Sequence, residues 1–301
     1  MDRIEDYASR EKITALAEKI NLPEEPVNAA LKYIENGEYK KAGPYFGGLF
    51  SAETAADSAN AAAKLFNGKD GKPADSGFGL MAVFLIAAMK TKEIYDERGI
   101  GEDVYLETMS FFNEILNENL VFYGKYVFDR QWWYYRQIAC LIFKLGALEY
   151  EFKTINAKDE KFYGLPEGVN TLSVHIQTGA LLTRETLDDS YERAGVFFNE
   201  FFPAFDFKHF TCCSWLLAPA LTDLLPAGSR IAEFRSDYDI KHAFTDNEQF
   251  FGYVYKIKQK PEDLNSLPED TSLRRAVKKH LLAGGKIGEA TGVKKSVAER
   301  P

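Results

Sequence analysis

Helical spacing of apolar residues dominates the first half of the chain. Apolar positions recur every three to four residues in segments that glycine and proline separate. The pattern predicts helices over Ser9–Ile20, Glu25–Asn36, Ser51–Phe66, Ser76–Thr91, Glu102–Leu120 and Asp129–Phe152. The expected N-cap residues are Ser9, Ser51, Ser76 and Asp129. We therefore expect an all-helical N-terminal domain over residues 1–153.

The pattern changes after Phe152. Residues 153–170 are polar and contain glycine and proline, so we place the domain junction there. Thr171–Gln177 then alternates strictly between apolar and polar residues, and His175 is on the polar side. A period of two is typical of a half-buried strand with one polar face.

Further strands and helices alternate in the second half. We expect strands at Phe210–Trp215, Ser229–Phe234 and Phe250–Lys258. Helices are expected at Leu187–Phe202, Leu216–Leu225 and Leu273–Leu282. Interleaved strands and helices predict a mixed α/β domain over residues 154–301, which ends in a basic tail. The fold class of the whole chain is then α+β.

Composition narrows the class of protein. The chain has 301 residues, of which 46% are hydrophobic and 27% charged, as in ordinary soluble proteins. The longest apolar run, Gly77–Met89, is shorter than the ~20 residues of a membrane span, so we expect a buried helix and no membrane association. Three cysteines, no apolar leader and a net charge of −8 favour a cytoplasmic protein that does not bind nucleic acid.

Several catalytic motifs are missing from the sequence. It contains no GxxxxGK[ST] loop, no strand-linked GxGxxG and no HExxH. P-loop hydrolysis, Rossmann redox chemistry and zinc proteolysis are therefore disfavoured. Cys212, Cys213, His175 and His209 have ligand chemistry, but adjacent cysteines rarely reach one tetrahedral ion, so we expect no metal.

An arginine stands among tryptophans in the expected helix after Asp129. On such a helix Arg136 lies within about 60° of Trp132 and Trp133, where an unpaired cation is costly. One interpretation is a platform for an anionic or flat ligand. Its substrate-binding residues would be Arg130, Trp133, Arg136 and Glu149. The alternative is an interdomain salt bridge of Arg136, to Glu149 or Asp129.

Candidate catalytic groups lie on the expected strands. His175 could be a general base, although a polar strand face is also simply a solvated one. Cys213 and Ser214 lie on opposite faces of the strand at Phe210–Trp215. A thiol nucleophile there would use His175 or His209 as its base, whereas free cysteines more often pack in cores.

The helix at Leu273–Leu282 is a candidate for binding phosphate. Thr271 or Ser272 is its natural N-cap, and cations occupy its first turns. The candidate residues are Arg274, Arg275, Lys278, Gly284 and Gly285. The alternative is a solvated helix that ends at its glycines and continues into a loose tail.

Several ordered stretches resemble one known family. They are FDRQWWYYRQ, FKLGALEYE, SVHIQTGALL, FTCCSWLLAPALTDLLPAGSRIAEF and LPEDTSLRRAVKKHLLAGGKIG. Together they resemble bacterial acyltransferase-domain proteins, which have a helical N-acyltransferase N-terminal domain and a GNAT-like C-terminal domain. The resemblance covers residues 128–288, and the first 120 residues match only in helical character.

The resemblance implies direct acyl transfer from acyl-CoA, as co-substrate, to a small-molecule amine. His175 would be the base, and Ser214 or Cys213 would help to donate a proton. Arg136, Arg274 and Lys278 would face donor phosphates or an acidic acceptor. The family often has a histidine where this chain has Cys213, and no Arg/Gln-x-x-Gly-x-Gly/Ala phosphate loop is visible, which moves the expected CoA site to the basic helix.

Two further functions remain open from the sequence. The chain could be a non-catalytic protein of GNAT-like fold that binds a small ligand on Arg136 and Trp133. It could instead be a thiol enzyme that uses Cys212 or Cys213, which requires a thiol of lowered pKa.

Overall fold

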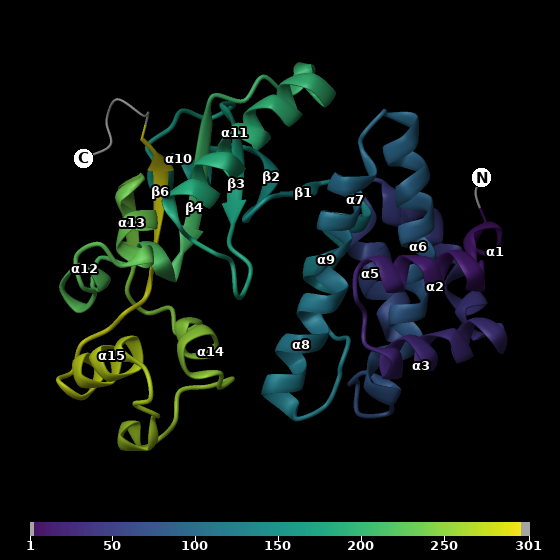
Figure 1. Ribbon diagram of the computed structural model, residues 1–301, viewed down its shortest axis with the longest axis horizontal. Helices are drawn as coiled ribbons and strands as arrows, with labels where there is room; N and C mark the ends of the chain where they lie inside the picture. The colour runs from purple at the N-terminus through teal and green to yellow at the C-terminus, as the bar shows by residue number, and fades with distance from the viewer. Residues whose placement is uncertain (1–2, 296–301) are drawn as a thin grey trace. The chain divides into compact units, whose positions relative to one another are not determined.

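The computed structural model describes residues 3–295, which form two compact units that meet in sequence between Lys144 and Leu145 (Figure 1). We call them the N-terminal unit and the C-terminal unit. The division comes before the expected junction after Lys153, because residues 142–154 form strands instead of the end of a helix.

The N-terminal unit is helical, as expected. Its helices are α1 (Ile4–Tyr7), α2 (Arg10–Lys19), α3 (Glu24–Glu35), α4 (Gly43–Phe46), α5 (Ala55–Lys64), α6 (Phe78–Glu97), α7 (Glu102–Met109), α8 (Phe111–Tyr123) and α9 (Gln131–Ile138). Ser9 is the N-cap of α2, since its Oγ accepts a 3.3 Å hydrogen bond from Lys12 N. The N-caps expected at Ser51, Ser76 and Asp129 are wrong, because α5, α6 and α9 begin after Thr54, Gly77 and Arg130.

Helix α6 is the core of the N-terminal unit. It is long and apolar enough to cross a membrane by length and composition. Every residue from Gly77 to Ala88 is nevertheless buried within the fold, so the prediction of a buried helix is confirmed. Gly77 starts the helix with φ 80°, and a Cβ there would collide with the carbonyl of Phe128. Only glycine fits this position.

The helix expected over Asp129–Phe152 is wrong in its second half. Helix α9 ends at Ile138, and the chain continues as β1 (Ile142–Leu145) and β2 (Leu148–Thr154). Gly146, with φ 73°, lies between the two strands. In β2, apolar residues alternate strictly with Glu149, Glu151 and Lys153, a period of two that is typical of a strand.

The C-terminal unit is built on a sheet with the order β1-β2-β3-β4-β6-β5. The remaining strands are β3 (Asn170–His175), β4 (His209–Ser214), β5 (Tyr238–Phe244) and β6 (Glu289–Lys294). Strands β3 and β4 pair in parallel, whereas the pairs β2–β3, β4–β6 and β5–β6 are antiparallel. This mixed sheet confirms the expected α+β fold class.

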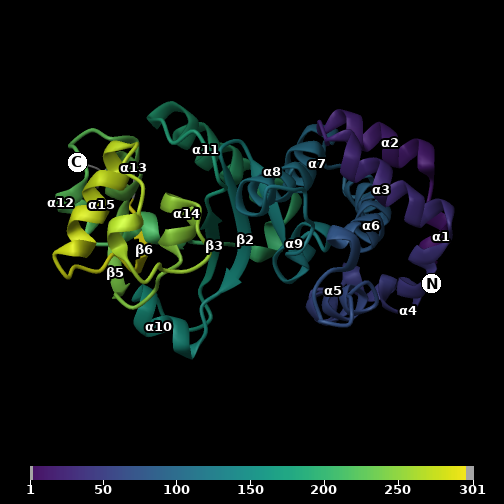
Figure 2. The same cartoon turned by 90° about the horizontal axis from the view of Figure 1, so that it is seen from below.

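Two helices cover opposite faces of the sheet (Figure 2). Helix α11 (Arg184–Phe201) packs on the apolar face, where its Phe198 meets Phe152 edge to face and its Tyr191 meets Tyr150. Helix α10 (Ala157–Tyr163) lies on the other face, where Thr291 Oγ1 donates to Phe162 O. We call this second face, which carries Glu149, Glu151 and His175, the polar face.

Three expectations for the second half are wrong. Residues 229–234 form helix α13 (Arg230–Ser236), which Ser229 caps by accepting from Ala232 N at 3.3 Å. Residues 250–258 begin with helix α14 (Phe250–Tyr255), whose continuous apolar residues are ambiguous between strand and helix. The expected tail contains β6, which lies between β4 and β5 inside the sheet.

Four other expected elements are confirmed with small shifts in their ends, and a fifth is much shorter than expected. Strands β3 and β4 and helix α11 lie where the periodicity places them. Helix α15 (Ser272–Leu282) begins after Thr271, whose side chain accepts from Arg274 N at 3.1 Å. The helix expected at Leu216–Leu225 is reduced to a short turn and α12 (Leu221–Leu224).

Candidate active site

The two parallel strands part at their carboxyl ends. Pairing between β3 and β4 runs from Thr171–His209 to Val174–Cys212, and no further pair joins them within the described sheet. Beyond this point β4 stays paired with β6 on its other side, through Cys213 and Ser214. The carboxyl ends of parallel strands are the usual ligand site of such sheets. All three predicted catalytic residues, His175, Cys213 and Ser214, lie at this opening.

His175 is paired with a carboxylate on the neighbouring strand. Its Nε2 lies 2.9 Å from Oε2 of Glu151, and each side chain is less than a quarter exposed. The β2–β3 register places Glu149 opposite His175, and Glu149 is itself buried. A carboxylate on one ring nitrogen orients an imidazole and stabilises its protonated form. The pair can therefore take a proton from a bound group.

Glu151 was not expected as a site residue. The predicted helix over Asp129–Phe152 would put it at a helix end, where it would not face the strand of His175. The alternation of Glu149, Glu151 and Lys153 with apolar residues was the signal that could have placed it on a strand face.

Cys213 and Ser214 have different surroundings. Ser214 Oγ accepts a 3.2 Å hydrogen bond from Leu216 N, and its own hydroxyl proton remains available to donate. Cys213 keeps contact with solvent, yet the atoms packed around its sulfur and the nearby Glu289 carboxylate raise its pKa to about 12. Burial also raises the pKa of Cys212. Neither cysteine has the lowered pKa that a thiol nucleophile requires.

A helix N-terminus follows directly after the opening. Thr183 and Thr186 cap α11 reciprocally, which leaves the N–H groups of Arg184 and Glu185 without intrahelical acceptors. The partial positive charge of the helix end favours an anion there. In the preceding loop, Gln177 Nε2 is buried and makes no hydrogen bond within the described residues. These donors suit a diphosphate.

This candidate anion site at the start of α11 was not expected, because the expected phosphate signature was a glycine motif. The signal was the order of the predicted elements: a strand, a helix and a second strand. Such a unit places the N-terminus of the helix at the carboxyl end of the first strand.

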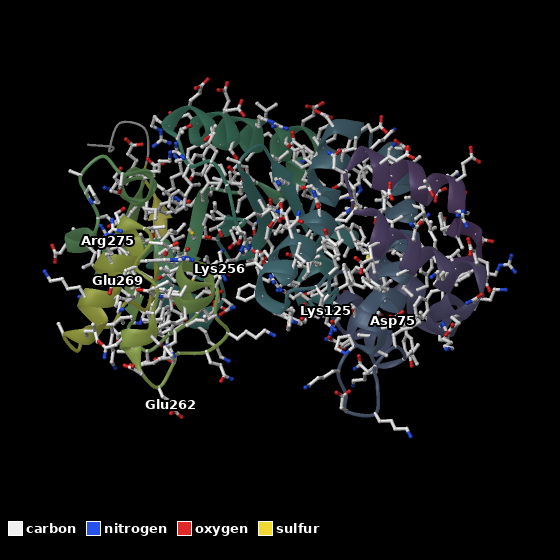
Figure 3. The ribbon with its side chains drawn as sticks, turned by 60° about the horizontal axis from the view of Figure 1, so that its bottom comes forward. Asp75, Lys125, Lys256, Glu262, Glu269 and Arg275 are labelled. Carbon is white, nitrogen blue, oxygen red and sulfur yellow. The ribbon has the colours of Figure 1, made fainter. Side chains whose placement is uncertain are left out.

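The cations of α15 contact their own surroundings. Arg274 Nε donates to Val254 O at 2.8 Å, and its Nη1 pairs with Asp270 at 2.8 Å. Arg275 donates to the carbonyl of Glu269, and Figure 3 shows these two residues close together. Lys278 is buried, with its three N–H groups on Asn265 O, Leu267 O and the Glu269 carboxylate. A phosphate-binding role for these cations stays a prediction.

The two glycines after α15 terminate the helix. Gly284 has φ 84°, and its N–H donates to Leu281 O. Gly285 N donates to His280 O, and a Cβ at Gly285 would collide with the ring of His280. These contacts give both glycines a structural role at the helix end.

The predicted platform lies partly on α9. The Arg136 guanidinium is 4.5 Å from the centroid of the Trp133 ring, a cation–π contact. Arg130 instead pairs with Glu118 of α8, and Glu149 belongs to the C-terminal unit. The structure therefore confirms the contact of Arg136 with Trp133, whereas Arg130 has its own partner within the N-terminal unit. Across residues 3–295, no group of three His, Cys, Asp or Glu side chains could hold a metal ion.

Known solved structures share this fold. One is described as an acyltransferase in complex with decanoyl-CoA and teicoplanin, with 21% identity, 95% of this chain and 88% of that chain covered, and a TM-score of 0.76. Another, described as an acyltransferase in complex with CoA and 10C-teicoplanin, has the same identity and coverage and a TM-score of 0.77. A third, in complex with decanoyl-CoA, has 22% identity, covers 97% and 88% of the chains, and has a TM-score of 0.74.

Family models match nearly the whole chain. The N-acyltransferase N-terminal domain matches residues 11–140, and the GNAT-like C-terminal domain matches residues 142–294. No curated protein sequence matches significantly. The two matched ranges meet close to the division between the two units. The chain therefore belongs to the family of proteins that join an N-acyltransferase N-terminal domain to a GNAT-like C-terminal domain.

Proposed function

We propose that the protein is an acyl-CoA-dependent N-acyltransferase that moves an acyl group directly to a small-molecule amine. The observation that carries this proposal is the His175–Glu151 pair at the opening between β3 and β4. The opening joins a base to an anion-binding helix end. The acyl-CoA complexes of the solved structures with this fold support the same donor.

The donor would bind along the opening. Its diphosphate would lie at the N-terminus of α11, where the N–H groups of Arg184 and Glu185 and the Nε2 of Gln177 are donors. The pantetheine arm would pair with the edge of β4 that faces away from β6, as an added strand. The thioester would then lie beside His175.

Different residues of the opening carry out the successive steps of the reaction. His175 takes the proton of the attacking ammonium, and Glu151 stabilises the resulting imidazolium. The neutral amine then forms a bond to the thioester carbon while the C–S bond breaks. Backbone N–H groups of β4 stabilise the developing oxyanion. The departing thiolate receives a proton from Ser214 or Cys213, which lie at the same end of β4. The second proton that the acylated nitrogen loses then restores this residue.

Thermal unfolding tests the donor. We would measure the midpoint with acetyl-CoA, with decanoyl-CoA and with desulfo-CoA. A ligand at 100 times its Kd adds about 2.7 kcal/mol to the folded state. This should raise the midpoint by ~2–4 °C for a domain of 150–250 residues. The absence of a shift with all three ligands would contradict the proposal, and a control nucleotide such as AMP should give a smaller shift.

A further inference from the structure

The helical segment between β5 and β6 lies beside the proposed active site. Residues 245–288 connect β5 to β6 and contain α14 and α15. Most of α14 is buried in a local apolar core with α15, in which Phe250, Phe251, Val254 and Tyr255 take part. Tyr253 is the exception, because 47% of it is exposed. The buried neighbours therefore present one aromatic ring to solvent from a fixed support.

The exposed ring faces a second one. The centroids of Tyr253 and Trp215 are 6.3 Å apart, and their ring planes are nearly parallel, at 18°. Trp215 packs partly against the same local core. Two stacked rings leave an outer ring face and ring edges, against which a third aromatic ring can pack.

Trp215 lies on the same face of the sheet as His175. It follows Ser214, whose extended backbone (φ −157°, ψ 149°) continues the alternation of β4. Trp215 therefore leaves the strand on the polar face, as Cys213 does, about 7 Å farther along. His175 lies on this face, on the neighbouring strand. Figures 1 and 2 both show α14 by the carboxyl ends of β3 and β4.

We propose that Trp215 and Tyr253 form a subsite for an aromatic ring that the acceptor carries next to its amine. This inference rests on the proposed function and adds the class of acceptor, a ring-bearing amine. The ring would lie against Tyr253 and Trp215 while the amine reaches His175. The two aromatic residues thereby determine specificity, and they do not take part in the chemistry.

The position of the rings distinguishes the acceptor from the adenine of the donor. Adenine follows the diphosphate, whose proposed site is the N-terminus of α11, and α11 covers the apolar face of the sheet. Trp215 leaves β4 on the opposite face. A ring held by Trp215 and Tyr253 is therefore on the side of the sheet where His175 receives the acceptor.

Binding measurements on the full chain test the subsite. Tyramine is the ring-bearing probe and n-hexylamine the ringless one, titrated with desulfo-CoA present at saturation. In Tyr253→Ala we expect the affinity for tyramine to fall about five- to tenfold, as loss of an aromatic contact predicts. The affinities for n-hexylamine and for desulfo-CoA should be unchanged. Tyr253→Phe should keep most of the affinity for tyramine.

Tyr45→Ala is the matched control, because Tyr45 is an exposed tyrosine of the N-terminal unit. It should leave all three affinities unchanged, and the unfolding midpoint of each variant shows that it is folded. A wild-type protein that fails to bind tyramine, or binds it no better than n-hexylamine, overturns the subsite. Weaker binding of decanoyl-CoA but not of its pantetheine thioester in Tyr253→Ala would assign the ring to adenine and also overturn it.

The two proposals fail separately. Binding of desulfo-CoA without preference for tyramine would leave the acyltransferase function standing and remove the subsite. Tyramine binding that depends on Tyr253, without any CoA binding, would keep a ring subsite and remove the donor.

Discussion

His175 Nε2 and Glu151 Oε2 lie 2.9 Å apart across the antiparallel pair of β2 and β3. They are diagonal neighbours, because the residue opposite His175 is Glu149 and the residue opposite Glu151 is Ser173. The contact therefore depends on the register of the two strands. A slip by one residue would send the side chains of one strand to the other face and separate the pair.

Replacing the carboxylate tests its role. Glu151→Gln keeps the shape of the side chain but removes the charge that stabilises an imidazolium. We expect kcat to fall at least about tenfold, which is a modest share of the gain that a positioned base provides. The affinity for desulfo-CoA should stay the same, since the proposed phosphate site is on α11. Steady-state kinetics over a range of pH values measure this, and an unchanged kcat would remove Glu151 from the mechanism.

Gln177→Ala tests the proposed phosphate site. Its buried Nε2 has no protein acceptor within the described residues, so a bound phosphate oxygen is the natural partner. We expect the Kd of desulfo-CoA to rise about tenfold, the effect of losing one hydrogen bond to a charged group. Calorimetric titration measures this Kd. Asn265→Ala, a change of amide far from α11 in sequence, is the control, and equal effects of both variants would contradict the assignment.

Thr183→Ala tests the cap that shapes the same site. Loss of an N-cap side chain costs about 1 kcal/mol of the free energy of unfolding. Urea unfolding should show this loss, and the Kd of desulfo-CoA should rise as the first turn of α11 becomes less ordered. Serine at this position should restore both quantities, because its hydroxyl can accept from Thr186 N. A stable Thr183→Ala protein would mean that α11 does not depend on this cap.

A substitution at Lys278 distinguishes a structural role of this residue from a phosphate-binding role. Its three N–H groups all have partners within the C-terminal unit. We expect Lys278→Met to lower the free energy of unfolding by about 2–3 kcal/mol, because buried carbonyls lose their donor. The affinity of the folded variant for desulfo-CoA should be that of the wild type. A selective loss of CoA affinity would instead support the phosphate role that the sequence suggested.

The thiol of Cys213 gives a prediction about pH. Its pKa in the folded state is about 12, above the ordinary value, because burial and Glu289 disfavour the thiolate. A raised folded pKa contributes stability that is fully present below the unfolded pKa and is lost as pH rises through the folded pKa. The stability contributed by Cys213 should therefore fall between about pH 9 and pH 12. Cys213→Ser should show a shallower loss in urea unfolding over this window.

Thiol labelling gives an independent measurement on Cys213. The native protein should react slowly with iodoacetamide at pH 8, and the denatured protein should react at the ordinary rate, since only the thiolate is nucleophilic. The Cys213→Ser variant identifies which signal belongs to this residue. Rapid labelling of native Cys213 at neutral pH would restore the thiol enzyme as a candidate.

Much of the fold follows from periodicity alone. The longer helices of the N-terminal unit, such as α3 and α6, repeat their apolar residues over several turns, so their pattern fits only a helix. Strand β6 is different, because its Glu-Ala-Thr-Gly-Val-Lys sequence has few residues typical of strands. It forms a strand because β4 and β5 bond to it on both sides, a tertiary cause that a local pattern does not contain.

The candidate site was predictable where local periodicity decides the structure, and not where pairing between strands decides it. His175 was identified because strict alternation fixed its strand and its face. Glu151 was missed because the helix predicted from Asp129 was extended through residues 148–153, whose period of two indicates a strand; β2 there pairs with β3. The proposed phosphate site depends on the parallel pairing of β3 with β4, which the sequence shows only as an order of elements.

Release of free CoA from decanoyl-CoA in the presence of a primary amine tests the central claim most directly. The wild-type protein should release CoA at a rate that depends on the amine and form the corresponding amide. His175→Ala should lower this rate about 10²- to 10⁴-fold, the usual contribution of a general base, while its Kd for desulfo-CoA stays unchanged. Equal rates for the two proteins, or CoA release without the amide, would contradict the account.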